Sequence, residues 1–130
     1  GMPIERAFVV HGEPGWDEAT PVGEFALFDV RPGKVTEARR SPEQYGMRRC
    51  APGDLAGGDA SHNAAQLRRV LTGEDRGAHR DALLMGTSLV LEVMGRVRNA
   101  GQGVKVAAAA IDDGAAGAFL ERLARHFADR

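Results

Sequence analysis

The hydrophobic pattern divides the chain into a first part with the period of strands and a second part with the period of helices. Residues 7–10 form a continuous apolar run of strand length, which predicts a strand covered on both faces and central in its sheet. Residues 25–30 predict a second strand, a turn signal follows at residues 31–34, and residues 35–38 predict a third strand that returns beside the second. The first part should therefore contain one central strand and a β-hairpin.

A short connection joins the two parts. Ser41 is placed to cap a helix, Pro42 suits the first helical position and Gly46 is a stop signal, so one helical turn is expected there. Residues 48–58 are rich in glycine and proline and predict a connecting loop. Because the sequence shows no internal repeat and no strong boundary, residues 2–130 are expected to form a single domain.

Two helices are predicted directly after this loop. Asp59 or Ser61 can cap the first, which ends at Gly73. Its apolar stripe comprises Ala60, Ala64, Leu67 and Leu71. The second covers residues 79–97 and is apolar almost all round between residues 82 and 94, with Glu92 the main exception, which predicts a helix buried on all sides. The small residues at 86–88 indicate the close approach of another backbone.

Two further apolar stripes predict a third and a fourth helix. Val104, Ala107, Ala108 and Ile111 form the third stripe, and Ala116, Leu120, Leu123 and Phe127 form the fourth. On the fourth helix, Glu121 and Arg125 are spaced for an i,i+4 ion pair. Together the elements predict an α/β fold in which about four helices cover a small sheet of one central strand plus a hairpin.

Composition narrows the classes of partner. The chain has 130 residues, enough to bury about two thirds of its unfolded surface in one core. Its 17 basic and 18 acidic residues nearly balance, which argues against a nucleic-acid partner. No apolar run approaches the roughly 20 residues that span a bilayer, so no membrane partner is expected.

The single cysteine, Cys50, leaves no internal disulfide and favours a reducing, cytoplasmic setting. Arg48 and Arg49 beside it could lower the pKa of the thiol, but without a catalytic partner in the sequence an inert thiol is the favoured interpretation.

Two adjacent carboxylates, Asp17 and Glu18, follow the first strand and a glycine-containing turn. Carboxylate oxygens are ligands that Mg²⁺ prefers, although composition alone favours a solvated loop or a helix cap. Trp16 beside them is favoured as a packing anchor over a substrate platform. The histidines are too widely separated for a zinc site, and a structural role is favoured over a general-base role for His11.

Three sequence blocks in a fixed order carry more information than any one of them. The first is Arg6-Ala-Phe-Val-Val-His-Gly, followed by Gly15-Trp-Asp-Glu-Ala-Thr. The second is Gly57-Gly-Asp-Ala-Ser-His-Asn-Ala, and the third is Gly77-Ala-His-Arg-Asp-Ala-Leu-Leu. Together they resemble roughly the last third of anthranilate phosphoribosyltransferase, whose members usually carry Gly-Leu-Asp-Glu in the first block and an asparagine near the position of Gly86.

The resemblance implies an activity, a metal and a substrate. Members of that family transfer the phosphoribosyl group of phosphoribosyl pyrophosphate to anthranilate in tryptophan biosynthesis. Their acidic pair, matched here by Asp17 and Glu18, helps to hold the Mg²⁺ that accompanies the pyrophosphate. Arg80 and Asp81 match a family Arg-Asp, but an ion pair on the helix surface explains them as well. Asn63 could cap a helix or bond to a loop.

Much of the family's catalytic equipment has no counterpart in this sequence. Its Gly-Thr-Gly-Gly-Asp diphosphate loop, its Lys-His-Gly-Asn segment and its N-terminal helical domain are not found here, so catalysis by this chain alone is not expected. Three hypotheses stay open. The chain is part of a phosphoribosyltransferase, a noncatalytic module that binds a small molecule or a protein, or a subunit that completes a phosphoribosyltransferase or nucleoside phosphorylase site with a separately encoded partner.

Overall fold

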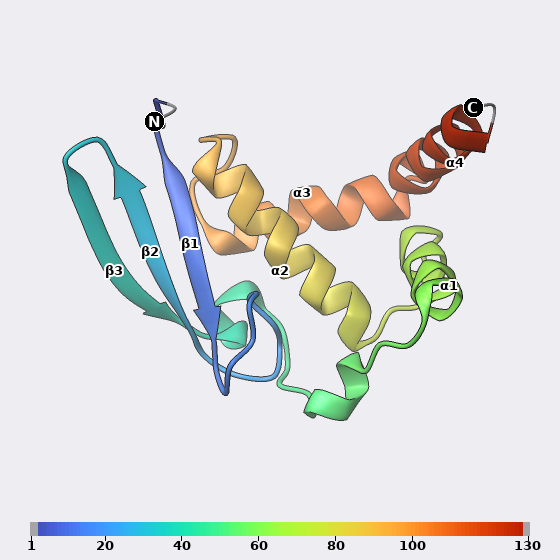
Figure 1. The fold of residues 1–130 in the computed structure, drawn as a ribbon, viewed down its shortest axis with the longest axis horizontal. Helices are drawn as coiled ribbons and strands as arrows, with labels where there is room; N and C mark the ends of the chain where they lie inside the picture. The colour runs from blue at the N-terminus through green and yellow to red at the C-terminus, as the bar shows by residue number, and fades with distance from the viewer. Residues whose placement is uncertain (1–2, 129–130) are drawn as a thin grey trace.

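The sheet lies at one end of the molecule and the helices extend away from it. The computed structural model describes residues 3–128. Strands β1 (Ala7–Gly12), β2 (Phe25–Arg31) and β3 (Lys34–Arg40) form an antiparallel sheet, and α-helices α1 to α4 follow in the chain (Figure 1). The predicted α/β class, a small sheet with about four helices, is confirmed.

The middle of the sheet is occupied by β2 and not by β1. The strand order is β1-β2-β3, with Val9 of β1 opposite Phe28, which lies opposite Glu37 of β3. The prediction that residues 7–10 form a central strand is therefore wrong within the described residues, where β1 is an edge strand and Val9 is 54% exposed. The predicted hairpin is confirmed, and Gly33 supplies the positive φ of 71° that its turn requires.

The connection from the sheet to the helices contains two short 3-10 helices. The first, η1 (Pro42–Tyr45), is the predicted single turn, with Ser41 before it and Gly46 in the left-handed conformation after it. The second, η2 (Pro52–Leu55), lies within the predicted loop. Tyr45 is buried and its ring centroid lies 5.9 Å from that of Phe25, so η1 is packed against β2.

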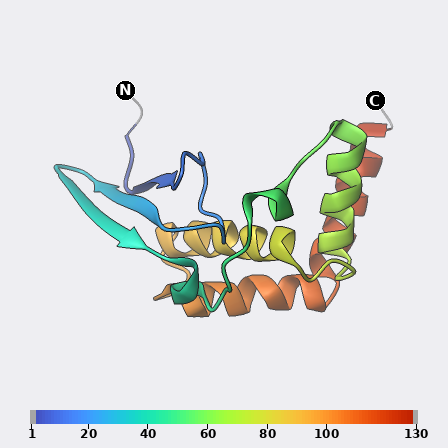
Figure 2. The same ribbon diagram turned by 90° about the horizontal axis from the view of Figure 1, so that it is seen from below.

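The four helices form two pairs. Their bounds are α1 (Ala60–Leu71), α2 (Ala78–Val93), α3 (Ala100–Asp112) and α4 (Ala115–Ala128). Helices α2 and α3 run side by side, whereas α1 and α4 stand together at the end away from the sheet (Figure 2). Asp59, and not Ser61, caps α1, because its carboxylate accepts a hydrogen bond from the backbone N–H of His62 at 2.8 Å.

One cluster of buried apolar side chains joins the sheet to the α2–α3 pair. Its largest members are Phe25, Leu27, Tyr45, Met47, Leu84, Met85, Leu89 and Ile111. Burying a side chain of this size stabilises the folded state by about 1.5–3 kcal/mol. The alternating positions of β2 and one face of α2 therefore supply five of the eleven buried side chains of this cluster, and η1, α1, α3 and the connecting segments supply the rest.

A polar junction fixes the end of α2 against the sheet. Glu92, 8% exposed, accepts hydrogen bonds from Arg40 at 2.9 and 3.0 Å, and the same Arg40 nitrogen also donates to the Tyr45 hydroxyl at 2.8 Å. Arg6 donates to the backbone carbonyl of Glu92 at 3.0 Å and to both carboxylate oxygens of Asp29. This junction explains the single charged residue in the apolar run between residues 82 and 94, because a buried carboxylate needs a paired cation.

The small residues of α2 lie on two different faces of the helix, and only one of these faces contacts α3. The predicted close approach is confirmed at Ser88, whose hydroxyl donates to the Ala100 carbonyl at 3.0 Å, and a Cβ added to Gly103 would lie 2.2 Å from its Oγ. Gly86 takes no part in this contact, because a Cβ added there meets no atom within 4 Å. The prediction that α2 is buried on all sides is wrong for this other face, where Val90 is 54% exposed.

Helix α4 has the predicted apolar stripe, of which Ala116 and Leu120 are half-buried and the later residues are exposed. Leu123 is 41% exposed and Phe127 is 63% exposed. The predicted ion pair between Glu121 and Arg125 is also wrong, since Glu121 pairs with Arg68 of α1 instead. Helix α4 therefore contacts the core only near its start, at Ala116, and packs against α1.

Candidate functional site

The segment that follows β1 folds back on the strand in a tight turn. The backbone N–H of Gly12 donates to the Trp16 carbonyl at 2.9 Å, and those of Gly15 and Trp16 donate to the Gly12 carbonyl at 2.9 Å. Gly15 has a φ of 127°, which favours glycine at that position. The turn delivers Asp17 and Glu18 directly beside the end of the strand.

Contacts on both sides hold the acidic pair in place. A Cβ added to Gly12 would lie 2.6 Å from the Glu18 carbonyl oxygen and 2.9 Å from the Trp16 Cβ, so only glycine permits this close approach. The following residues, Ala19 and Thr20, are 3% and 2% exposed and anchor the chain in the core. Asp17 and Glu18 are themselves exposed, and their carboxylates are free to bind a ligand.

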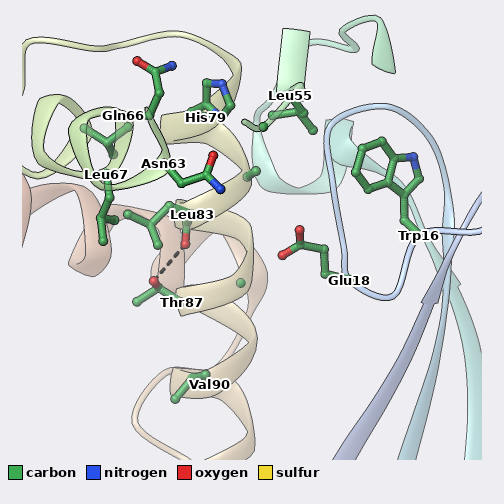
Figure 3. Close-up of a pocket in the computed structure, with 14 residues that line it drawn as sticks. Trp16, Glu18, Leu55, Asn63, Gln66, Leu67, His79, Leu83, Thr87 and Val90 are labelled. Atoms are coloured by element: carbon green, nitrogen blue, oxygen red, sulfur yellow. Dashed lines mark hydrogen bonds between the residues drawn. The ribbon is translucent and has the colours of Figure 1, made fainter. Parts of the chain in front are cut away.

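A pocket of about 740 Å³ opens next to this turn. It is bounded by the β1–β2 connection, η2, α1 and α2 (Figure 3). Its polar lining comprises Glu18, Asn63, Gln66, His79 and Thr87, and its larger apolar side chains are Trp16, Leu55, Leu67, Val70, Leu83 and Val90. Glu18, one of the two sequence-predicted carboxylates, thus lies at a concave site.

The structure brings only one of the two carboxylates into this pocket. Glu18 lines it, with its carboxylate pointing into the space between the β1–β2 connection and α2 (Figure 3), whereas Asp17 is not a lining residue. Between residues 3 and 128, no three histidine, cysteine, aspartate or glutamate side chains come together as a metal cluster. The pair therefore offers at most two protein ligands to a metal.

Two carboxylates fit Mg²⁺ better than they fit a structural metal. Mg²⁺ is usually held by one or two carboxylates together with substrate phosphates and water, whereas a closed zinc site needs about four protein ligands. The described residues that line the pocket include no lysine or arginine. An anionic phosphate in this pocket would therefore need a metal cation to offset the charge of Glu18.

Asn63 lies across the pocket from Glu18, and His79 lines the pocket near the start of α2 (Figure 3). Asn63 accepts from the Gly58 N–H at 2.9 Å and donates to the Gly58 carbonyl at 3.0 Å, which confirms that its side chain bonds to a loop. The sequence did not single out His79 as a pocket residue. Its spacing of four from Leu83 and eleven from Val90 on one helix face is the signal that could have found it.

Other predicted residues lie away from the pocket. His11 is exposed on β1, paired in register with Ala26. Trp16 is half-buried and both contacts the turn and lines the pocket, which is consistent with either interpretation of its role. Burial raises the pKa of the Cys50 thiol, as do the nearby carboxylates of Asp54 and Asp81, so the expectation of an unreactive thiol fits its surroundings.

Arg80 is not part of a surface ion pair with Asp81. It is 7% exposed, and one of its terminal nitrogens donates to both carboxylate oxygens of Asp112 at 3.0 and 3.1 Å. Since Asp112 ends α3 and Arg80 lies in the first turn of α2, this contact fixes the end of α2 that carries His79. Burial raises the pKa of the neighbouring Asp81 carboxyl.

Comparison with known proteins identifies the family of this chain. The sequence profile described as "Glycosyl transferase family, a/b domain" matches residues 1–117. This chain belongs to that glycosyl transferase family. An anthranilate phosphoribosyltransferase of Rubrobacter xylanophilus is 44% identical over 125 residues, which are 96% of this chain and 36% of the relative. One of Azorhizobium caulinodans is 47% identical over 121 residues, which are 93% of this chain and 35% of the relative.

Solved structures of the glycosyl transferase family share the fold. Anthranilate phosphoribosyltransferase from Thermus thermophilus superposes with a TM-score of 0.80 at 35% identity, covering 90% of this chain and 34% of that one. The enzyme from Saccharomyces cerevisiae in complex with PRPP and Mg gives a TM-score of 0.81 at 26% identity, covering 89% and 33%. The chain thus spans about a third of the length of the relatives that it matches.

The length and hydrophobicity of the helices bear on the expectation that the chain has no membrane partner. Among residues 3–128, none of the helices is both long enough and apolar enough to cross a membrane.

Proposed function

We propose that this chain forms part of an anthranilate phosphoribosyltransferase site, in which phosphoribosyl pyrophosphate donates its phosphoribosyl group to anthranilate. The single observation that carries the proposal is the Glu18 carboxylate, which a glycine-dependent turn directs into the pocket beside α2. The relatives named above carry this activity in their names, and the yeast structure is described with PRPP and Mg.

Asp17 and Glu18 would hold Mg²⁺ together with the diphosphate of the substrate. When bound, the metal supplies positive charge that stabilises a departing diphosphate. The chain's own contribution is the placement of two oxygen ligands, because Gly12 holds the Glu18 backbone close and the buried Ala19 anchors the next residue. Preorganised ligands lower the cost of binding, since they need no rearrangement when the substrate arrives.

The pocket also supports a role in excluding water around the substrate. Its apolar side chains, among them Trp16, Leu55 and Leu67, stand beside a few polar groups, an arrangement typical of small-molecule sites. Because the described lining contains no lysine or arginine, groups outside this chain would have to bind the remaining phosphate charge. The proposal therefore assigns the chain a metal-binding part of the site within a single domain, in a cytoplasmic setting, and not independent catalysis.

Isothermal titration of Mg²⁺ and phosphoribosyl pyrophosphate into the purified chain tests the proposal. Binding that requires both components is expected, and Asp17→Asn/Glu18→Gln should abolish it. The matched control, Glu5→Gln/Glu37→Gln, removes the same number of charges from exposed residues that do not line the pocket and should bind as the original chain does. No heat at millimolar ligand, or equal binding by both double variants, would contradict the proposed subsite.

A further inference from the structure

A second pocket, of about 470 Å³, lies where the turn from α2 to α3 meets the end of β3 and η1 (Figure 1). Arg40, Gln44 and Glu92 line it from β3, η1 and α2, and residues 98–101 line it from the turn and the start of α3. It shares no lining residue with the pocket beside Glu18. A ligand bound here would therefore occupy a site of its own, apart from the proposed metal site and from the exposed face of α2.

Arg40 holds Glu92 with only part of its guanidinium group. Its Nη1 donates to both carboxylate oxygens of Glu92 at 2.9 and 3.0 Å and to the Tyr45 hydroxyl at 2.8 Å. Among residues 3–128, no acceptor pairs with its Nε or Nη2, and its side chain is 22% exposed. A guanidinium group presents five N–H donors in a fixed fork. Arg40 can therefore stay bound to Glu92 and still donate to a ligand in the pocket.

Arg98 brings a positive charge that no carboxylate neutralises within the part of the chain that the structure describes. Its side chain is exposed and belongs to none of the ion pairs there, and its backbone N–H donates to the Gln102 side chain at 2.9 Å. Glu92 is the only carboxylate in the described lining, and it is already paired with Arg40 at 2.9 Å. The pocket therefore keeps one positive charge in excess.

Two side-chain amides add neutral donors to the same pocket. The Gln44 Oε1 accepts from the Ser41 N–H at 3.0 Å, and the Asn99 Oδ1 accepts from the Gln102 N–H at 2.9 Å. Since each oxygen is already used within the chain, the amide N–H groups are what each side chain has left for a ligand. The first N–H groups of α3, next to Asn99, also have no acceptor inside the helix. The described lining thus offers donors from three sides and no unpaired carboxylate.

We infer that this second pocket binds the phosphate group of a small ligand, with Arg40 and Arg98 as its cationic residues. Guanidinium groups bind oxyanions through charge-assisted hydrogen bonds, and one guanidinium alone can hold a planar carboxylate at two points. Donors that approach from β3, η1 and α3 suit a tetrahedral phosphate better, because its oxygens point in several directions. Binding of this kind requires no metal ion, so it is independent of the Mg²⁺ site proposed at Asp17 and Glu18.

Titration of inorganic phosphate into the isotope-labelled chain tests this site by nuclear magnetic resonance. The buffer contains a chelator in place of Mg²⁺ and is held at constant ionic strength with chloride, so that general screening does not change. Saturable shifts are expected for the backbone amides of Ala100 and Gly101. Glycerol phosphate, titrated in the same way, separates a site for phosphate esters from one for the free ion, and acetate serves as the carboxylate probe.

Two substitutions with equal changes of charge provide a matched comparison. Arg98→Gln removes the excess charge from the pocket, whereas Arg96→Gln removes one from an exposed residue that does not line it. We expect Arg98→Gln to raise the Kd for phosphate about tenfold, the effect of losing one charge-assisted hydrogen bond. Arg96→Gln should leave the Kd nearly unchanged.

A third variant, Gly101→Asp, places a carboxylate in the pocket and should abolish saturation. The nearest atom to a Cβ added at Gly101 is 3.6 Å away, and an acidic residue suits the first turn of a helix. The variant should therefore stay folded, which circular dichroism checks, and a loss of binding would report on the pocket itself.

Saturation by both inorganic phosphate and glycerol phosphate would assign the pocket to phosphate esters, and saturation by inorganic phosphate alone would assign it to the free ion. Either result supports the site. Four results would overturn the inference. They are the absence of saturable shifts, equal Kd values for the Arg96→Gln and Arg98→Gln variants, saturation that survives in Gly101→Asp, and acetate binding as tight as that of phosphate.

Discussion

The contact between α2 and α3 at Gly103 can be tested with two glycine-to-alanine substitutions. Replacing Gly103 should destabilise the fold, whereas replacing the nearby Gly101 should stabilise it. A Cβ added to Gly103 would lie 2.2 Å from the Ser88 Oγ, 2.8 Å from its Cβ and 2.9 Å from its Cα. Real Cβ contacts are longer than these, and one of the three atoms belongs to the backbone. The Gly103→Ala variant must therefore push the two helices apart.

Two opposing effects set the expected change in the free energy of unfolding. Replacing glycine by alanine inside a helix stabilises it by up to about 1 kcal/mol, whereas overpacking a core costs typically about 1–3 kcal/mol and occasionally more. With a backbone atom among the clashes the steric cost should dominate, so Gly103→Ala should lower the free energy of unfolding by about 1–2 kcal/mol. At Gly101, the nearest atom to an added Cβ is 3.6 Å away, and Gly101→Ala should raise it by up to about 1 kcal/mol.

Urea denaturation followed by circular dichroism measures both variants. With a slope of about 1–3 kcal/mol per molar urea for a protein of this size, the two midpoints should separate by roughly 1 M and fall on opposite sides of the original. If Gly103→Ala raised the midpoint as Gly101→Ala does, the close packing of α2 on α3 described above would be refuted.

Three further predictions concern the sheet, the first helix and the acidic turn. Arg6 lowers the pKa of the Asp29 carboxyl by hydrogen bonding, so this pair stabilises the fold above the usual aspartate pKa of about 3.9 and stops doing so as the pH falls through the lower folded value. Asp29→Asn should flatten the acid limb of stability against pH below about pH 4, and an unchanged limb would contradict this. Asp59→Ala should cost about 1 kcal/mol in urea denaturation through loss of the α1 cap, whereas Ser61→Ala should cost little, and equal costs would argue against the observed cap. Gly12→Ala should displace the Glu18 backbone and the contacting Trp16, which fluorescence of this single tryptophan can detect; an unaltered spectrum and unaltered Mg²⁺ titration would speak against the close approach.

The sequence predicted the elements more successfully than their surroundings. The periodicity of residues 25–38 and of the four helical stripes depends on local spacing, and all of these elements are present. Burial depends on neighbours that periodicity does not specify. The apolar run at residues 7–10 predicts a central strand but forms an edge strand, and the stripe of α4 ends with Phe127 at 63% exposure.

The sequence predicted only the part of the candidate site that depends on local spacing. The position of Asp17 and Glu18 after a strand and a glycine turn follows from sequence, but which of them enters a pocket depends on the path of the chain around Gly12. His79 comes from a segment far from Glu18 in the chain, so only the tertiary fold brings the two to one pocket. For Arg80 the sequence left a helix-surface ion pair and a ligand contact open, and the side chain instead pairs with Asp112, because the α2–α3 packing brings the start of one helix to the end of the other.

The polar junction around Glu92 gives the molecule an uneven resistance to local unfolding. It joins residues next to the start of β1, at the end of β3 and at the end of α2, through Arg6, Arg40 and Tyr45. If any one of these segments opened, the charged side chains of the other two would lose their buried partners. The three segments should therefore open together. The α1–α4 end has no such junction among the described residues and few buried side chains, so transient fraying should begin there. The half of the pocket carried by α1 would then be the adaptable half, while the sheet and the end of α2 provide a rigid frame.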